Sequence, residues 1–213
     1  MKKGVKGKGK KRKERGKERR KRVKRISYIA LILAILAILA LCFYFDKEIV
    51  SSISMMQSSF LNQIMLIISY LGIFAVIFIF STCLVFLHDK KKIKALWLSF
   101  AVTAALVFLL KIIVNRARPF TLGLNTLNLL IRSSYTTWDS SFPSSHSAIA
   151  FAALPFFKGK LKYYWFVFSC LIAFSRVFFA LHYPSDVIAG ALIGYAISIT
   201  FTKIFKLKKG IIK

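Results

Sequence analysis

Acidic residues are scarce in this chain of 213 residues, which has only 7 Asp and Glu against 34 Lys and Arg. The net charge of +27 by itself would suggest a protein that binds nucleic acid. However, 57% of the residues are hydrophobic, a composition typical of a chain that lies mostly in lipid. We therefore expect a membrane protein with no nucleic-acid partner, in which charged and apolar segments are separated along the sequence.

Cysteines are few in this sequence, and glycine-rich phosphate-binding loops are missing. The 3 cysteines lie inside apolar runs, at no spacing typical of metal ligands, and they are too few for a disulfide framework. The chain has no repeat of fixed period and no phosphate-binding loop of the Walker or Rossmann type. These absences favour a single all-helical membrane domain.

The first 25 residues form a basic segment with sixteen Lys and Arg and almost no apolar side chain, so we expect a disordered tail. The tail is either a solvated topogenic signal or a surface for anionic lipid headgroups, which attract each basic side chain by roughly 1 kcal/mol. Ile26 to Phe45 then form an uncharged stretch, about 30 Å long as a helix, which matches the hydrocarbon core of a bilayer. The stretch is too long for a signal peptide, and we expect an uncleaved anchor.

Five more apolar segments predict an all-α bundle of six transmembrane helices. They are Phe60 to Leu87, Ala95 to Ile113, a short segment from about Pro143 to Phe157, Tyr164 to Leu181, and Val187 to Phe205. If all six segments cross, 28 of the 34 basic residues lie on the side of the tail, as the positive-inside rule requires. The sequence therefore predicts a multi-pass protein of the cell membrane, with a cytoplasmic tail 1–25, a membrane domain 26–205 and a basic cytoplasmic tail 206–213.

Six cations fall outside the cytoplasmic pieces, and an ionised side chain inside a bilayer costs about 2.5–3.5 kcal/mol, so each is a candidate for function. They are Lys47, Lys111, Arg116, Arg118, Arg132 and Arg176. Lys111 and Arg118 lie about two helical turns apart and share one face if the helix continues to Pro119. We expect Arg116 and Arg132 to face outward, either as ordinary interfacial cations or as ligands of a lipid headgroup.

Two further clusters are predicted at the same outer face. The sequence Pro-Ser-Ser-His at 143–146 opens the fourth segment, where free N–H groups at a helix start favour an anion. The second cluster contains Ser175, Arg176, His182 and Asp186, and Pro184 predicts that a helix begins between its histidine and its carboxylate. A carboxylate four residues from an imidazole can accept its N–H and leave the other nitrogen free to attack.

These residue types suit a tetrahedral dianion. Phosphoryl transfer needs in-line positioning and neutralisation of the charge on the equatorial oxygens. Of two imidazoles with pKa values near 6.5, one can serve as nucleophile and the other as acid for the leaving group. The chemistry requires no metal and no other cofactor.

The three clusters in this order resemble the three-part signature of the type-2 phosphatidic acid phosphatase superfamily. The matching residues are Lys111-x6-Arg118-Pro119, Pro143-Ser144-Ser145-His146 and Ser175-Arg176-x5-His182-x3-Asp186. Each part alone is a weak signal, whereas three parts in order with this spacing are a strong one. The resemblance covers residues 111–186 directly, and the six-helix layout is similar to the integral-membrane branch of that superfamily over about 26–205.

The resemblance implies a role for each matching residue. Those that would hold the phosphate are Lys111, Arg118, Ser144, Ser145 and Arg176. His182 would attack phosphorus and form a phosphohistidine, while Asp186 orients it. His146 would protonate the leaving group and then activate water.

Ser145 stands where the superfamily usually has glycine, and a Cβ resists the left-handed backbone that glycine allows. Either the backbone of Ser145 is right-handed and its hydroxyl is an added donor, or the anion site is impaired. We favour the first alternative.

The resemblance implies a metal-independent phosphatase for a lipid phosphomonoester or diphosphate, with its active site at the extracytoplasmic face. Phosphatidic acid, phosphatidylglycerol phosphate and a polyprenyl diphosphate are all candidate substrates, with a slight preference for the last. Two alternatives stay open: a lipid phosphotransferase with the same phosphohistidine, and a non-catalytic lipid-binding protein that keeps only the anion cradle. Six apolar segments argue against a soluble vanadium haloperoxidase, whose anion site is similar. The sequence does not indicate an oligomeric state.

Overall fold

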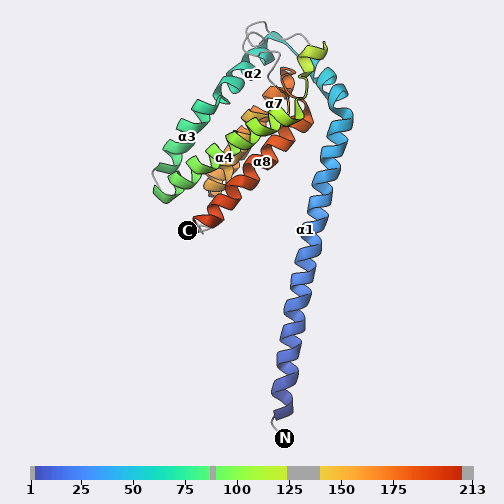
Figure 1. Ribbon diagram of the computed structural model, residues 1–213, viewed down its shortest axis with the longest axis vertical. Coiled ribbons are helices and arrows are strands. Elements are labelled where there is room, and N and C mark those ends of the chain that lie inside the picture. Colours follow the sequence, from blue (N-terminus) through green and yellow to red (C-terminus); the bar gives the residue numbers. More distant parts are fainter. Residues whose placement is uncertain (1–2, 87–89, 124–139, 208–213) are drawn as a thin grey trace. The chain divides into compact units, whose positions relative to one another are not determined.

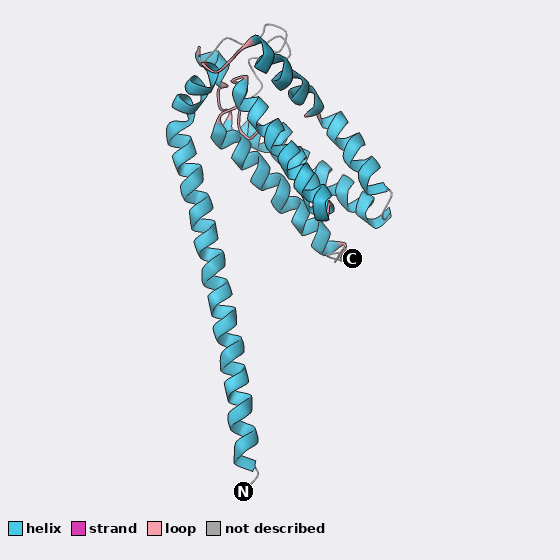
Figure 2. Ribbon diagram, turned by 180° about the vertical axis from the view of Figure 1, so that it is seen from behind, coloured by secondary structure: helices cyan, strands magenta, loops and turns pink. Residues whose placement is uncertain are grey.

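The computed structural model describes residues 3–86, 90–123 and 140–207. These residues form helices and connecting loops without a strand, which confirms the predicted all-α class (Figure 2). The chain divides into two compact units, Met1–Leu41 and Cys42–Lys213. Helix α1 (Lys3–Ser54) begins in the first unit and ends in the second.

Helix α1 includes the basic segment for which the sequence predicted disorder. Lys, Arg and Glu all have high helix propensity, so such a segment can take helical backbone without an apolar core. The division of the chain at residue 25 into a tail and a membrane domain stays a prediction.

The second unit is a helical bundle in which α4, α7 and α8 run alongside one another (Figure 1). Its elements after α1 are α2 (Ser59–Leu71), α3 (Phe74–Phe86), α4 (Lys90–Val114), the 3-10 turn η1 (Pro119–Leu122), α6 (Ser145–Ala153), the 3-10 turn η2 (Leu154–Phe156), α7 (Gly159–Phe178) and α8 (Pro184–Ile204). The main apolar core joins α3, α4, α6 and α7 around residues such as Ile77, Phe100, Ile149 and Trp165.

The short helix α6 lies at the centre of this bundle, in contact with α3, α4, α7 and α8. Its Ala148, Ala150 and Ala152 are fully buried, because small side chains let neighbouring helices approach closely. A Cβ atom at Gly194 would collide with the backbone carbonyl of Ala148, and one at Gly190 would collide with the carbonyl of Ser144. These two glycines therefore hold α8 in backbone contact with α6.

Three helical segments of the described chain are long and apolar enough to cross a bilayer. They are Lys90–Thr121, Gly159–Phe178 and Pro184–Ile204, and a pair bent by 66°, Ser59–Leu71 with Val76–Cys83, would make a fourth span. Ser145–Phe156 is apolar but rises only about 18 Å as a helix, less than the hydrocarbon core of about 30 Å. The multi-pass character is clear, whereas six spans stay a prediction.

Candidate active site

The loop between α7 and α8 presents His182. The backbone carbonyl of Arg176 accepts hydrogen bonds from the amides of Leu181 and His182, at 3.0 and 3.2 Å. Helix α8 begins two residues after His182 at Pro184, whose fixed φ suits the first turn. The imidazole is only 2% exposed, between the end of one helix and the start of the next, as the sequence predicted.

Hydrogen bonds at both ring nitrogens select one tautomer of His182. Nδ1 lies 2.6 Å from the carbonyl oxygen of Ser141, which can only accept, so Nδ1 carries the proton. Nε2 lies 3.2 Å from Nη1 of Arg118, which can only donate, so Nε2 keeps its lone pair. The sequence predicted that Asp186 accepts the N–H, but its Oδ2 lies 3.7 Å from Nδ1, and the Ser141 carbonyl takes that place.

The surroundings keep the His182 ring neutral. Burial lowers the pKa of His182 well below its ordinary value of 6.5, and the positive charges of Arg118, Lys111 and Arg176 lower this pKa further. The hydrogen bond to Ser141 opposes the shift. A neutral imidazole that keeps its lone pair on Nε2 is the form that can attack phosphorus.

Three cations from different segments surround this imidazole. Lys111 lies in the last turn of α4, Arg118 directly precedes η1, and Arg176 lies in the last turn of α7. The carbonyl of Ser140 accepts from both Lys111 and Arg118, and the hydroxyl of Ser69 accepts from Arg176. The structure thus brings together the three cations of the three motifs, and it adds two serines that no motif indicated.

His146 occupies the second position of α6 and lines a cavity of about 330 Å³ together with Lys111 and Ser145. The remaining walls of this cavity are apolar: Ala104, Val107, Phe108 and Ile149. His146 lies within electrostatic reach of His182 and of the three cations. The two histidines and the three cations therefore belong to one site, beside a cavity with hydrocarbon walls.

The two serines of the second motif differ in position. Ser144 is fully buried and caps α6, its hydroxyl accepting from the amide of Ser147 at 3.5 Å. Its own amide donates to the carbonyl of Asp186 at 3.1 Å, which ties the starts of α6 and α8 together. Ser145 begins α6 and is not among the residues with positive φ. Its backbone is right-handed, as we favoured, so this serine causes no strain in place of glycine, and the hydroxyl as an added donor stays a prediction.

Arg116 is the largest departure from the sequence-based expectation. Instead of facing outward, its guanidinium donates to the carboxylates of Asp186 at 2.7 Å and Asp46 at 2.8 Å. Asp46 is only 2% exposed, although it lies beyond the end of the first apolar segment. One signal was present in the sequence, since Asp46 directly follows the twenty uncharged residues of the first apolar segment. Arg132 lies outside the described residues.

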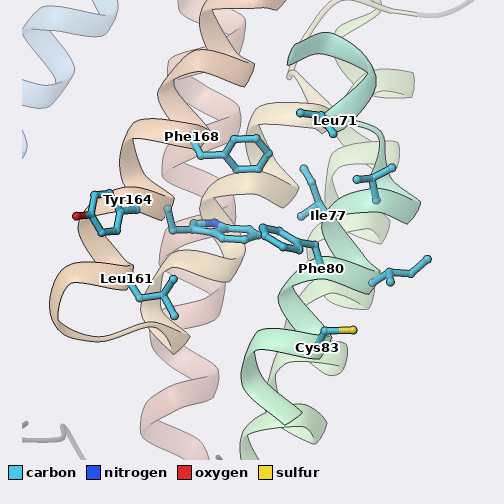
Figure 3. A pocket seen from close by; sticks show the side chains of 10 residues that line it. Leu71, Ile77, Phe80, Cys83, Leu161, Tyr164 and Phe168 are labelled. Atoms are coloured by element: carbon cyan, nitrogen blue, oxygen red, sulfur yellow. The ribbon is translucent and has the colours of Figure 1, made fainter. Parts of the chain in front are cut away.

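A second and larger cavity, of about 720 Å³, lies between α2 and α3 on one side and α7 on the other (Figure 3). Apolar and aromatic side chains line it, among them Leu71, Ile77, Phe80, Leu161 and Phe168. None of the described residues that line this cavity is charged, so it does not suit a phosphate group.

Comparison with known proteins agrees with this geometry. A sequence model of the PAP2 superfamily matches residues 92–209, more than half of the chain. An undecaprenyl-diphosphatase from Sulfolobus acidocaldarius is 30% identical over 159 residues, which are 72% of this chain and 75% of that protein.

Two solved structures are similar as well. The crystal structure of LpxE from Aquifex aeolicus superposes with a TM-score of 0.63 and 28% identity, over 75% of this chain and 95% of that one. A transmembrane PAP2-type phosphatidylglycerolphosphate phosphatase from Bacillus subtilis has a TM-score of 0.63 and 22% identity, over 85% of this chain and 97% of that one. The latter similarity concerns the fold alone.

Proposed function

The chain belongs to the PAP2 superfamily, and we propose that it is an integral-membrane lipid phosphatase that removes the terminal phosphate of a polyprenyl diphosphate. The preference for this lipid phosphate rests on the Sulfolobus acidocaldarius relative, which is named an undecaprenyl-diphosphatase. Phosphatidic acid and phosphatidylglycerol phosphate carry the same phosphoryl group and are the comparison substrates.

The observation that carries the proposal is the convergence of two imidazoles and three cations on one site. Lys111, Arg118 and Arg176 supply three positive charges for the oxygens of the terminal phosphate, which stabilise charge in the transition state. Ser145 at the start of α6 adds a hydroxyl, and Ser144 fixes that helix start by capping it.

In the first step, Nε2 of His182 attacks the terminal phosphorus with its lone pair. The bond from phosphorus to the bridging oxygen breaks, and its electron pair stays on the leaving lipid monophosphate. His146 in its imidazolium form, which the negative charge of the substrate favours, gives a proton to that oxygen. Support for these roles comes from the Nδ1–H tautomer of His182 and from the position of His146 beside Lys111 in the cavity.

In the second step, the now neutral His146 accepts a proton from a water molecule whose oxygen attacks the phosphohistidine. The bond between phosphorus and Nε2 breaks, inorganic phosphate leaves, and His182 regains its lone pair. Both histidines then return to their starting states, so the cycle requires no metal ion.

We place the site at the extracytoplasmic face of the cell membrane, with six spans and both termini cytoplasmic. The 16 basic residues of segment 1–25 would then lie against anionic headgroups of the inner leaflet, together with tail 206–213. The membrane domain comprises residues 26–205. This orientation follows from the distribution of basic residues.

Phosphate release from polyprenyl diphosphate, phosphatidic acid and phosphatidylglycerol phosphate tests the function in detergent-purified protein. We expect the diphosphate to be hydrolysed with the highest kcat/KM, vanadate to inhibit, and EDTA to have no effect. His182→Ala should lower kcat at least about a thousandfold, because it removes the nucleophile. Lys111→Ala should also abolish measurable turnover, because it removes one of the phosphate ligands.

Four outcomes would contradict the proposal. Turnover that survives in His182→Ala would remove the nucleophile, and a strict requirement for Mg²⁺ would indicate another mechanism. Transfer of phosphate to an added alcohol without release of inorganic phosphate would identify a phosphotransferase. The absence of any turnover despite vanadate binding would identify a non-catalytic lipid-binding protein.

A further inference from the structure

Asp46 is a buried carboxylate in α1 for which none of the three motifs assigns a role. Its Oδ1 accepts from the backbone amide of Ser185 at 3.0 Å, and its Oδ2 accepts from the Ser185 hydroxyl and from Nη2 of Arg116. Ser185 lies in the first turn of α8, next to Asp186. One acidic side chain thus contacts both the start of α8 and the cation that pairs with Asp186.

Five side chains contact the Arg116 guanidinium, one of them Ser185, whose hydroxyl accepts from Nη1 at 2.8 Å. Its two terminal nitrogens donate to two different carboxylates, Nη1 to Asp186 at 2.7 Å and Nη2 to Asp46 at 2.8 Å. The guanidinium carbon lies 4.0 Å from the ring centre of Tyr183 and 4.9 Å from that of Phe43. A guanidinium that contacts two aromatic rings and pairs with two carboxylates has little freedom to turn.

Asp186 in turn acts on the segment that holds the imidazole. Its Oδ2 accepts from the Ser141 hydroxyl and from the amide of Tyr183, the latter at 2.8 Å. The carbonyl of the same Ser141 accepts the Nδ1 proton of His182 at 2.6 Å. A continuous set of hydrogen bonds therefore leads from Asp46 through Arg116, Asp186 and Ser141 to His182.

We propose that Asp46 is a positioning residue for the phosphatase reaction, which through Arg116 and Ser185 holds Asp186 in the orientation that fixes Ser141 and the Nδ1–H tautomer of His182. The inference deepens the proposed function, since it takes His182 as the nucleophile. It gives α1 a part in the site, although the three motifs lie entirely within residues 111–186.

Substitutions that change the number of buried charges around Arg116 test the positioning role of Asp46. In the wild type, the two carboxylates share one guanidinium. Arg116→Gln leaves two buried negative charges close together with no cation between them, which is costly. Asp46→Asn in that background removes one of the two charges and keeps a side chain of the same size and an oxygen that can accept from Ser185.

The kinetic experiment compares Asp46→Asn, Arg116→Gln and the double variant with Glu48→Gln, a matched control because Glu48 is an exposed carboxylate two residues away in the same helix. Asp46→Asn should lower kcat about 10- to 100-fold, as the loss of a residue supporting a reacting group does, with KM nearly unchanged. Arg116→Gln should lower kcat further, and the double variant should be more active than Arg116→Gln. Glu48→Gln should match the wild type.

A second readout does not depend on turnover. The chain has 3 histidines, so ¹⁵N-histidine NMR can resolve the His182 ring after assignment by its loss in His182→Gln. We expect the Nδ1–H tautomer in the wild type and in Glu48→Gln, and a mixture of tautomers in Asp46→Asn. Only variants that elute as a single symmetric peak on gel filtration are compared, because this elution indicates that they are folded.

Different results would overturn the positioning role of Asp46 and the proposed function. Asp46→Asn with wild-type kcat and wild-type tautomer would overturn the positioning role, as would a double variant less active than Arg116→Gln. A wild type that hydrolyses no lipid phosphate, but whose His182 tautomer still depends on Asp46, would overturn the proposed function and keep the positioning role.

Discussion

At the residue scale, burial rather than residue type decides what each charged side chain does. Asp46 is 2% exposed, whereas its helix neighbours Lys47 and Glu48 are exposed. Successive residues of a helix point about 100° apart, so one of three adjacent charges can face the bundle while the others face outward. The buried one carries hydrogen bonds to Arg116 and Ser185, and the exposed ones fit an interface with water.

The pH dependence of the reaction belongs to the same scale. Because burial and neighbouring cations lower the pKa of His182, its neutral form persists to pH values below 6.5. In the free enzyme, protonation of His182 would remove the nucleophile, so the acid limb of kcat/KM should lie below pH 6.5 in the wild type. Steady-state hydrolysis between about pH 4.5 and 8 measures this limb.

The acid limb of kcat/KM can be compared between the wild type and Arg118→Gln. Removal of one positive charge 3.2 Å from Nε2 raises the pKa of His182, so the acid limb should move to higher pH while kcat/KM falls overall. The same substrate is used for both proteins, so its own ionisation cancels. An acid limb that is unchanged in Arg118→Gln would show that another group controls it.

At the scale of elements, the site depends on how closely α6 and α8 approach. Gly190 and Gly194 of α8 lie against the backbone of Ser144 and Ala148 in α6. The first turns of these two helices carry His146 and Asp186, and the amide of Ser144 donates to the Asp186 carbonyl. The close approach of Gly190 and Gly194 to α6 thus helps to determine how far apart the starts of the two helices lie.

Gly194→Ala tests this packing. The added methyl group collides with the Ala148 carbonyl, so the two backbones must separate. We expect a loss of about 1–3 kcal/mol in stability, seen as a lower thermal midpoint in detergent, and a lower kcat. Ala196→Val is the control, because Ala196 is exposed on the same helix. Equal midpoints for the two variants would mean that α6 and α8 do not require this contact.

At the scale of the whole molecule, four helices each have one end at the site. Helices α4 and α7 begin near lysines and end at the site, with Lys111 and Arg176 in their last turns. Helices α6 and α8 run the other way and begin at the site. The proposed phosphate ligands therefore gather at one end of the bundle, and in the proposed topology the lysines of the other end lie on the cytoplasmic side.

Accessibility in intact cells tests this orientation. In a background with Cys42, Cys83 and Cys170 replaced by alanine, Ser133→Cys should react with a membrane-impermeant maleimide, because it lies in the loop after the third segment. Lys160→Cys, in the first turn of α7, should react only after permeabilisation. The reverse pattern would turn the site toward the cytoplasm and contradict the proposed topology.

The sequence by itself determined the helical class, the membrane setting and the residues of the three motifs. Apolar runs and charge counts are local properties, and the spacing of Lys111, Arg118, His182 and Asp186 is fixed along the chain. The right-handed backbone of Ser145 was likewise predictable, because a helix start directly after a capping serine is a local feature.

Only the tertiary structure decided which groups meet across the bundle. The Ser141 carbonyl rather than Asp186 accepts the proton of His182, and Arg116 pairs with Asp46 from a helix 70 residues earlier. Hydrogen bonds of this kind depend on distances of a few tenths of an ångström between segments far apart in sequence. Helix packing sets these distances, and no local pattern in the chain predicts them.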